Sequence, residues 1–163
     1  FTVLTLRLSS KILNKSIVMN TQQKDLSYFR LRLQELLNTS FPEKANDQKF
    51  IEQRSSWASN AYESAFRAGN TIEQCNEIAN YILFEGLHFS KFDTVFQVVC
   101  NEFDTIMADE ELRPFALKIF PVCEPVFSGY ELTDDFAYGY EFDLLYTEIT
   151  GTIAIWIEEN GLQ

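Results

Sequence analysis

The chain offers few residue combinations that could do chemistry, and the clearest surrounds its single histidine, His88. Asp93 and Cys100 follow His88 within the next twelve residues. A histidine that is oriented by a carboxylate can act as a general base toward a thiol, so these three residues could form a nucleophilic site. Glu85 and Lys91 would border it. One hypothesis is therefore an enzyme with a site near His88.

The neighbours of these residues favour a structural role instead. Cys100 shares an apolar helical stripe with Phe96, where a buried thiol is more often inert than activated. Gly86 to Phe89 can form a turn between two helices, with His88 bonding to the carbonyls left free at the end of the first helix. Ser90 can cap the second helix. The sequence therefore predicts no catalytic residues, with His88, Asp93 and Cys100 as the weak candidates.

Other kinds of catalytic or metal site find no support. The sequence contains no phosphate-loop, dinucleotide-binding, zincin or nucleophile-elbow motif. The three cysteines, Cys75, Cys100 and Cys123, are scattered, which is typical of reduced thiols in a cytoplasmic protein rather than of a zinc site. The acidic loop from Glu131 to Asp135 lacks the ligand spacing of a calcium loop. We expect no metal and no cofactor.

Charge is distributed unevenly along the chain. The formal net charge is −11, and residues 93–163 carry fifteen acids against two bases, Arg113 and Lys118. A chain of this charge repels nucleic acid and anionic membranes, so we expect direct binding to neither. No apolar run is long enough to span a membrane. The acidic half could instead attract a cationic partner, such as a basic DNA-binding protein.

The apolar residues recur at helical intervals over most of the chain, which predicts an all-α fold. We expect a single-domain multihelical bundle of about six helices, covering roughly residues 26–39, 46–68, 71–85, 90–107, 109–127 and 142–160. Pro121 and Pro125 should kink or split the fifth helix after Phe120. Residues 150–157 are rich in β-branched side chains, so a strand is the alternative to a helix there.

The N-terminal residues differ from the remainder in composition. Residues 1–24 carry four bases and no acid, and Met19 precedes a polar run. We interpret residues 1–24 as an extension that is flexible or lies upstream of a natural start at Met19. Residues 25–163 would then form the single helical domain.

The segment between the last two predicted helices is aromatic. Its four aromatic residues, Tyr130, Phe136, Tyr138 and Tyr140, are of the type that anchors protein interfaces. The alternative is that they cover the core, since single exposed apolar residues are common. The leading hypothesis is a non-enzymatic cytoplasmic protein that docks on a protein partner or self-associates.

The acidic residues suggest an alternative function. Carboxylates that imitate the spacing of phosphates could occupy the nucleic-acid cleft of a basic protein, as in an acidic DNA mimic that opposes restriction. The candidate phosphate substitutes are Asp109, Glu110, Glu111, Asp134, Asp135, Glu141, Asp143, Glu158 and Glu159. A solvated acidic surface is the simpler interpretation, because charge runs usually serve solubility.

Three blocks of sequence carry a resemblance to a known family: GLHFSKFDT, DDFAYGYEFDLLYTEITGTI and the closing ENGLQ. They resemble a family of short, uncharacterised bacterial proteins, a domain of unknown function, from anaerobic gut or oral species. The resemblance covers about residues 25–163. It implies an all-helical fold and a setting on conjugative mobile elements, but no established activity and no catalytic residues.

Overall fold

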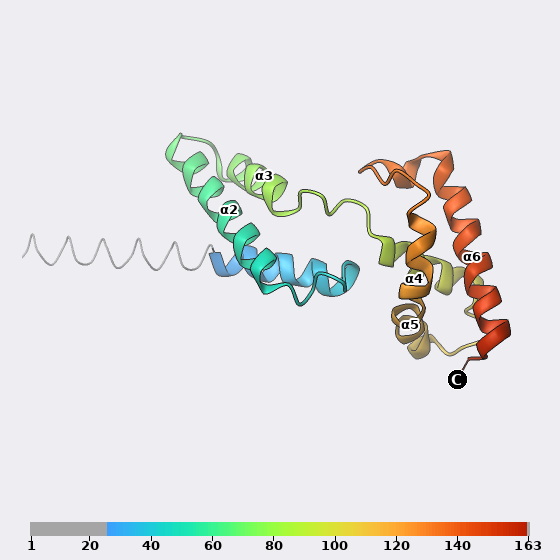
Figure 1. The fold of residues 1–163 in the computed structure, drawn as a ribbon. Helices are drawn as coiled ribbons and strands as arrows, with labels where there is room; N and C mark the ends of the chain where they lie inside the picture. Colours follow the sequence, from blue (N-terminus) through green and yellow to red (C-terminus); the bar gives the residue numbers. More distant parts are fainter. Residues whose placement is uncertain (1–25, 163) are drawn as a thin grey trace, which may run out of the picture. The chain divides into compact units, whose positions relative to one another are not determined.

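The computed structural model describes residues 26–162, and every regular element in that range is a helix. Six α-helices and one short 3₁₀ helix are present among the described residues, so the predicted all-α multihelical fold is confirmed (Figure 1). The predicted extension over residues 1–24, including Met19, lies outside the described residues. None of the described helices is both long and apolar enough to cross a membrane.

The described residues form two compact units where the sequence predicts one domain. Among the described residues, unit 1 contains residues 26–38 and 43–85, and unit 2 contains Thr39–Pro42 and residues 86–162. No stretch rich in glycine, proline or serine separates them, since the chain passes between the units at Gly86 and at the four-residue segment 39–42. A division without a linker leaves no compositional signal, and the single helical domain over residues 25–163 stays a prediction.

Unit 1 consists of the helix over residues 26–40 up to Asn38, α2 (Gln48–Arg67) and α3 (Ile72–Leu83). The sequence defines their ends: the Asp47 side chain accepts the Phe50 N–H at 3.0 Å, and Thr71 forms a reciprocal capping box with Gln74. Helices α2 and α3 lie side by side (Figure 1). Their facing positions hold small buried residues, Ser55, Ala58, Ser59, Ala65, Cys75 and Ala79, which allow the two backbones to approach closely.

Unit 2 is built from α4 (Lys91–Glu102), α5 (Asp109–Phe127), the 3₁₀ helix η1 (Phe136–Tyr138) and α6 (Tyr140–Asn160). Helices α4, α5 and α6 pack on one another around a single apolar core (Figure 1). Helix α6 contributes Leu145, Ile149 and Ile153, which are fully buried. Their spacing of four residues aligns them on one face of the helix.

The segment Thr39–Pro42 is fixed to unit 2 by its backbone carbonyls. The Ser90 hydroxyl donates a hydrogen bond to the carbonyl of Ser40, and Arg113 donates from Nη2 to the carbonyl of Thr39 at 3.1 Å. Ser90 also accepts the Asp93 N–H at 2.9 Å, as predicted for the cap of α4. Phe41 is only 4% exposed. We call residues 39–42 the anchor segment.

Of the two predicted alternatives for the fifth helix, a kink or a split after Phe120, the split is wrong, because α5 continues from Asp109 to Phe127 through all of its prolines. Pro114, Pro121 and Pro125 are spaced seven and four residues apart and all are exposed. A proline on the solvent side frees a carbonyl that water can satisfy, so the helix continues. The strand alternative for residues 150–157 is also wrong, since the segment lies within α6.

We predict that Ser90→Ala lowers the free energy of unfolding by about 2–3 kcal/mol, because it removes the α4 cap and leaves the buried Ser40 carbonyl without its donor. The control is Thr71→Ala, which removes a cap that has no second partner and should cost about 1 kcal/mol. Urea titration of both variants measures the difference. Equal losses would show that the anchor segment does not depend on Ser90.

Candidate functional site

The three residues of the predicted nucleophilic site do not come together. His88 is exposed in the turn before α4, Asp93 lies in the first turn of α4, and Cys100 lies near its end. Seven residues of α-helix between Asp93 and Cys100 correspond to about 10 Å along the helix axis. A base, its orienting carboxylate and a nucleophile need hydrogen-bond distances between them. This geometry does not supply them.

The electrostatics of Cys100 also oppose activation. Burial raises the pKa of the Cys100 thiol, and the negative charges of Asp104 and Asp109 raise it further. A nucleophilic cysteine needs the opposite shift, toward the thiolate at neutral pH. Burial likewise raises the pKa of Cys123 to about 12. The thiols of Cys100 and Cys123 therefore resemble inert core side chains rather than nucleophiles.

Asp93 belongs to the surroundings of the anchor segment. Burial raises the pKa of Asp93, while a hydrogen bond with Ser40 and the positive charge of Arg113 oppose that rise. The Arg113 guanidinium lies 5.0 Å from the centre of the Phe92 ring. Both charged side chains thus face the anchor segment. Their arrangement holds the chain there.

The role that the sequence predicted for His88 is filled by Arg54. This arginine of α2 donates from Nη1 to the carbonyl of Ile82 at 3.1 Å and to that of Glu85 at 2.7 Å. It therefore satisfies the carbonyls at the end of α3 that His88 was expected to bind. Among the described residues no cluster of histidine, cysteine and carboxylate side chains could hold a metal ion.

Some aromatic residues of the segment before α6 are buried in the core, and others are exposed on the surface. Phe136 is buried and stands at the centre of a ring cluster, 5.2 Å from Phe89, 5.7 Å from Tyr130 and 6.4 Å from Phe142. It is therefore unable to anchor a partner, and Tyr130 is half-buried beside it. Tyr138 and Tyr140 are 89% and 79% exposed. Of the predicted interaction residues, these two are accessible.

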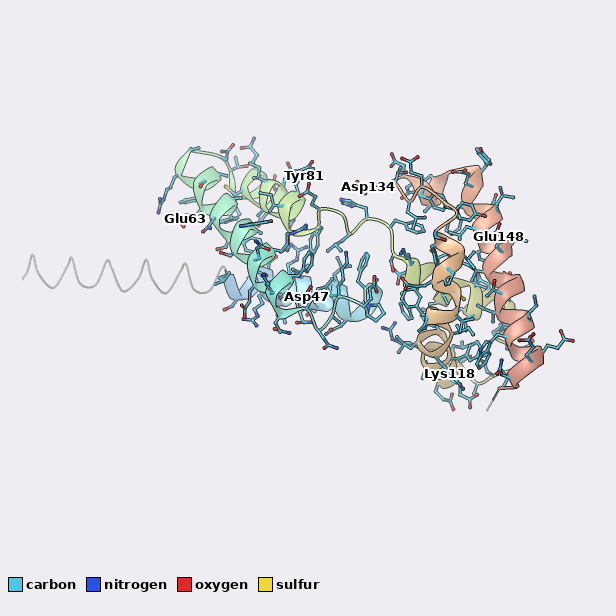
Figure 2. All side chains as sticks on the ribbon, in the orientation of Figure 1. Asp47, Glu63, Tyr81, Lys118, Asp134 and Glu148 are labelled. Atoms are coloured by element: carbon cyan, nitrogen blue, oxygen red, sulfur yellow. The ribbon has the colours of Figure 1, made fainter. Side chains whose placement is uncertain are left out.

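Helix α6 continues this exposed aromatic surface with aliphatic side chains. Leu144 and Ile155 are 55% and 58% exposed, although the opposite face of the same helix is buried. At 100° per residue, Tyr140, Leu144, Gly151 and Ile155 fall within an arc of about 60°. Figure 2 shows side chains projecting from α6 both toward α4 and α5 and away from them. We call these four residues the outer face of α6.

The hydroxyl groups next to this face are already satisfied. Thr147 donates to the carbonyl of Asp143 at 2.9 Å and Thr152 donates to that of Glu148 at 2.8 Å. Threonines that bond back to their own helix present mainly a methyl group to the outside. The outer face is therefore more apolar than its sequence suggests. Sequence reasoning missed Leu144 and Ile155, because it followed only the stripe that faces the core; their apolar character outside that stripe was the available signal.

The acidic residues predicted as phosphate substitutes are all exposed. They gather toward the two ends of α6. Near its N-terminus, a pocket of about 220 Å³ is lined by Glu131, Asp135, Phe136, Tyr140 and Glu141, among others. Near its C-terminus, Glu158 and Glu159 are exposed, and a pocket of about 290 Å³ is lined by Glu111 and Lys118 of α5 together with Leu162.

The length of α6 separates these acidic regions. A helix of 21 residues is about 30 Å long. Between its ends, Glu148 is the one carboxylate of α6, and a hydrogen bond links it to Tyr130. The exposed surface of α6 therefore carries acids at both ends and, between them, the apolar Leu144 and Ile155 beside the single acid Glu148.

We predict that His88→Ala changes the free energy of unfolding by less than about 0.5 kcal/mol, because His88 is exposed. Arg54→Ala should cost about 1.5–3 kcal/mol, since it removes two charge-assisted bonds to the end of α3. Thermal and urea denaturation of both variants measure this. A larger loss in His88→Ala than in Arg54→Ala would reverse the assignment.

We predict that one thiol, Cys100, reacts slowly with a disulfide reagent in the native protein, and that Cys75 and Cys123 react only on unfolding, because both are buried. The rate at Cys100 should rise with pH, since its raised pKa keeps it protonated at neutral pH. Asp104→Asn should accelerate it by removing a negative charge. Cys100→Ser is the control that must abolish the native reaction; rapid labelling at pH 7 would contradict the assignment.

Comparison with known proteins identifies a family. A family model described as "Domain of unknown function (DUF1896)" matches residues 21–162. A crystal structure of protein PG0816 from Porphyromonas gingivalis is similar to the chain with a TM-score of 0.81 and 38% sequence identity, over 88% of this chain and 98% of that one. A search of curated proteins found no match. The predicted resemblance to a domain-of-unknown-function family is thus confirmed, and the chain belongs to the family described as domain of unknown function (DUF1896).

Proposed function

We propose that this protein is a non-enzymatic docking module that binds a protein partner through the outer face of α6. The observation that carries the proposal is the exposure of Tyr140, Leu144 and Ile155 along one side of a helix whose other side is buried. Exposed apolar side chains that are aligned on one face of a helix can mark a contact surface. A partner would cover them.

We choose this surface over others in the chain because its exposed apolar side chains lie on one face of one helix. In unit 1 the large exposed apolar side chains are spread over three helices, and Trp57 and Phe66 of α2 are nine residues apart, which places them on opposite sides of that helix. Those of α6 share one face. Tyr140, Leu144 and Ile155 are aligned along about 22 Å of one helix face, and aromatic and aliphatic side chains are typical of the centre of a protein interface.

An enzyme is less well supported. The candidate catalytic residues His88, Asp93 and Cys100 lie too far apart to cooperate, and the raised pKa of Cys100 disfavours its thiolate. The proposed setting is the cytoplasm, where free thiols such as the three cysteines persist. The family resemblance noted for the sequence suggests that the partner belongs to a conjugative mobile element.

The acidic DNA mimic is the second candidate. Exposure of all nine predicted phosphate substitutes supports it. A mimic needs a continuous row of charges along its length, whereas α6 carries a single acid, Glu148, over the roughly 22 Å between Asp143 and Glu158. The salt dependence of binding separates the two proposals, because purely electrostatic binding weakens steeply as salt rises.

We predict that the full chain, immobilised in a native cell lysate, retains a partner at high salt and that Leu144→Ser with Ile155→Ser lowers the retained amount about tenfold or more, because two apolar contacts are lost. The matched control is Leu117→Ser with Val122→Ser, which removes exposed apolar side chains from α5 and should retain the partner. Quantitative mass spectrometry compares the eluates.

Two results would contradict the docking module. Equal retention by both double variants would show that the outer face of α6 is not the binding surface. Release of basic DNA-handling proteins at moderate salt, unaffected by either variant, would favour the mimic.

A further inference from the structure

The centre of the outer face of α6 is a glycine that the chain itself does not require. Gly151 lies inside the helix, and a Cβ added there would meet no atom within 4 Å. Glycine inside a helix costs about 0.5–1 kcal/mol relative to alanine. Neither backbone conformation nor internal packing accounts for this residue. A surface without a side chain at this point does, however, allow another backbone to approach α6 closely.

The shape around Gly151 fits a helix. Leu144 lies seven residues before it and Ile155 four residues after it, so an exposed aliphatic side chain stands on each side of the glycine along one face. Two packed helices lie 8–10 Å apart depending on the side chains between them, and small residues permit the shorter distances (about 8 Å). A partner helix could therefore cross α6 at Gly151 and pack its own apolar side chains on Leu144 and Ile155.

The charges on α6 indicate which kind of partner helix would bind there. Helix α6 contains five acids, Glu141, Asp143, Glu148, Glu158 and Glu159, and no base. The pocket at its N-terminal end adds Glu131 and Asp135 and includes the ring of Tyr140. An aromatic ring beside carboxylates is a favourable environment for an arginine or lysine side chain. The acids at both ends of the outer face thus attract cations, and between them Leu144 and Ile155 offer apolar contact beside the single acid Glu148.

A second copy of this chain fits less well. Two α6 helices packed on each other in a parallel arrangement would bring Glu141 next to Glu141, and an antiparallel arrangement would bring Glu141 next to Glu158. Like charges oppose association in both cases. The partner should therefore be a different chain with positive charge.

We propose that the outer face of α6 binds an amphipathic helix of a partner protein that carries basic residues at both ends and apolar residues between them, and that this helix packs against Gly151. This inference rests on the proposed docking function and specifies its partner. Binding of amphipathic helices to apolar surfaces with charge complementarity at the edges is a common recognition mode.

The test uses the full chain and two synthetic helical peptides of about 20 residues. Both carry leucine and alanine on one face; one carries arginine at its ends and the other carries glutamate. Fluorescence anisotropy should show binding of the arginine peptide and binding at least about tenfold weaker for the glutamate peptide, a difference of about 1.4 kcal/mol or more. Equal binding of the two peptides would overturn the charge assignment.

Gly151→Gln provides the decisive variant. It should weaken binding of the arginine peptide about tenfold or more by placing a side chain at the crossing point, while the protein becomes more resistant to urea because glutamine is the better helix former. Unfolding therefore cannot explain a loss of peptide binding by Gly151→Gln. Unchanged peptide affinity in Gly151→Gln would overturn the proposed crossing point.

Matched charge variants distinguish a specific site from general attraction. Glu141→Gln with Asp143→Asn should weaken binding more than Glu77→Gln with Glu85→Gln, which removes the same charge from unit 1. Equal weakening would show nonspecific attraction and reject the inference. Self-association in analytical ultracentrifugation that Gly151→Gln abolishes would reject it in favour of a second copy.

The two proposals fail in different ways. If the lysate partner depends on Leu144 and Ile155 but the arginine peptide does not bind, the docking function stands and the basic helix is wrong. If the peptide binds as expected but retention of the lysate partner does not depend on Leu144 or Ile155, the docking function is wrong for that partner.

Discussion

The structure depends on the attachment of the anchor segment to unit 2. Backbone carbonyls cannot be buried without donors except at a cost of about 1–3 kcal/mol each, and the Ser90 hydroxyl and the Arg113 guanidinium supply those donors for Ser40 and Thr39. The same serine caps α4. One side chain therefore starts a core helix and fixes a segment fifty residues away in the sequence. The chain enters unit 2 at this segment, returns to unit 1, and enters unit 2 again at Gly86.

This attachment accounts for residues that otherwise look catalytic. Asp93 and Arg113 are charged groups close together in a partly buried place, a combination that often marks an active site. Here their partners are the backbone and side chain of the anchor segment. The perturbed pKa of Asp93 reflects burial at a structural joint. His88 lies nearby in sequence but is exposed and takes no part in it.

Helix α6 combines two roles that are usually separated. Leu145, Ile149 and Ile153 complete the core of unit 2, while Leu144 and Ile155 extend away from it. Exposed aliphatic side chains are common on protein surfaces when they are scattered singly. Their alignment with Tyr140 and Gly151, between two acidic regions, is what makes this face a candidate interface. The proposed partner helix would match this face with apolar residues in the middle and positive charge at each end.

The sequence by itself determined the helices. Local effects determine where the helices begin and end. These effects are the spacing of apolar residues, the caps formed by Thr71 and Ser90, and the positive φ angles of Gly86 and Gly161. Tertiary structure alone decided the anchor segment, the use of Arg54 in place of His88, the burial of Phe136, and the continuity of α5 through prolines that face solvent. Each of these depends on contacts between residues far apart in the chain or on which side of a helix faces water. Periodicity marks an apolar face, but only packing shows whether that face is covered.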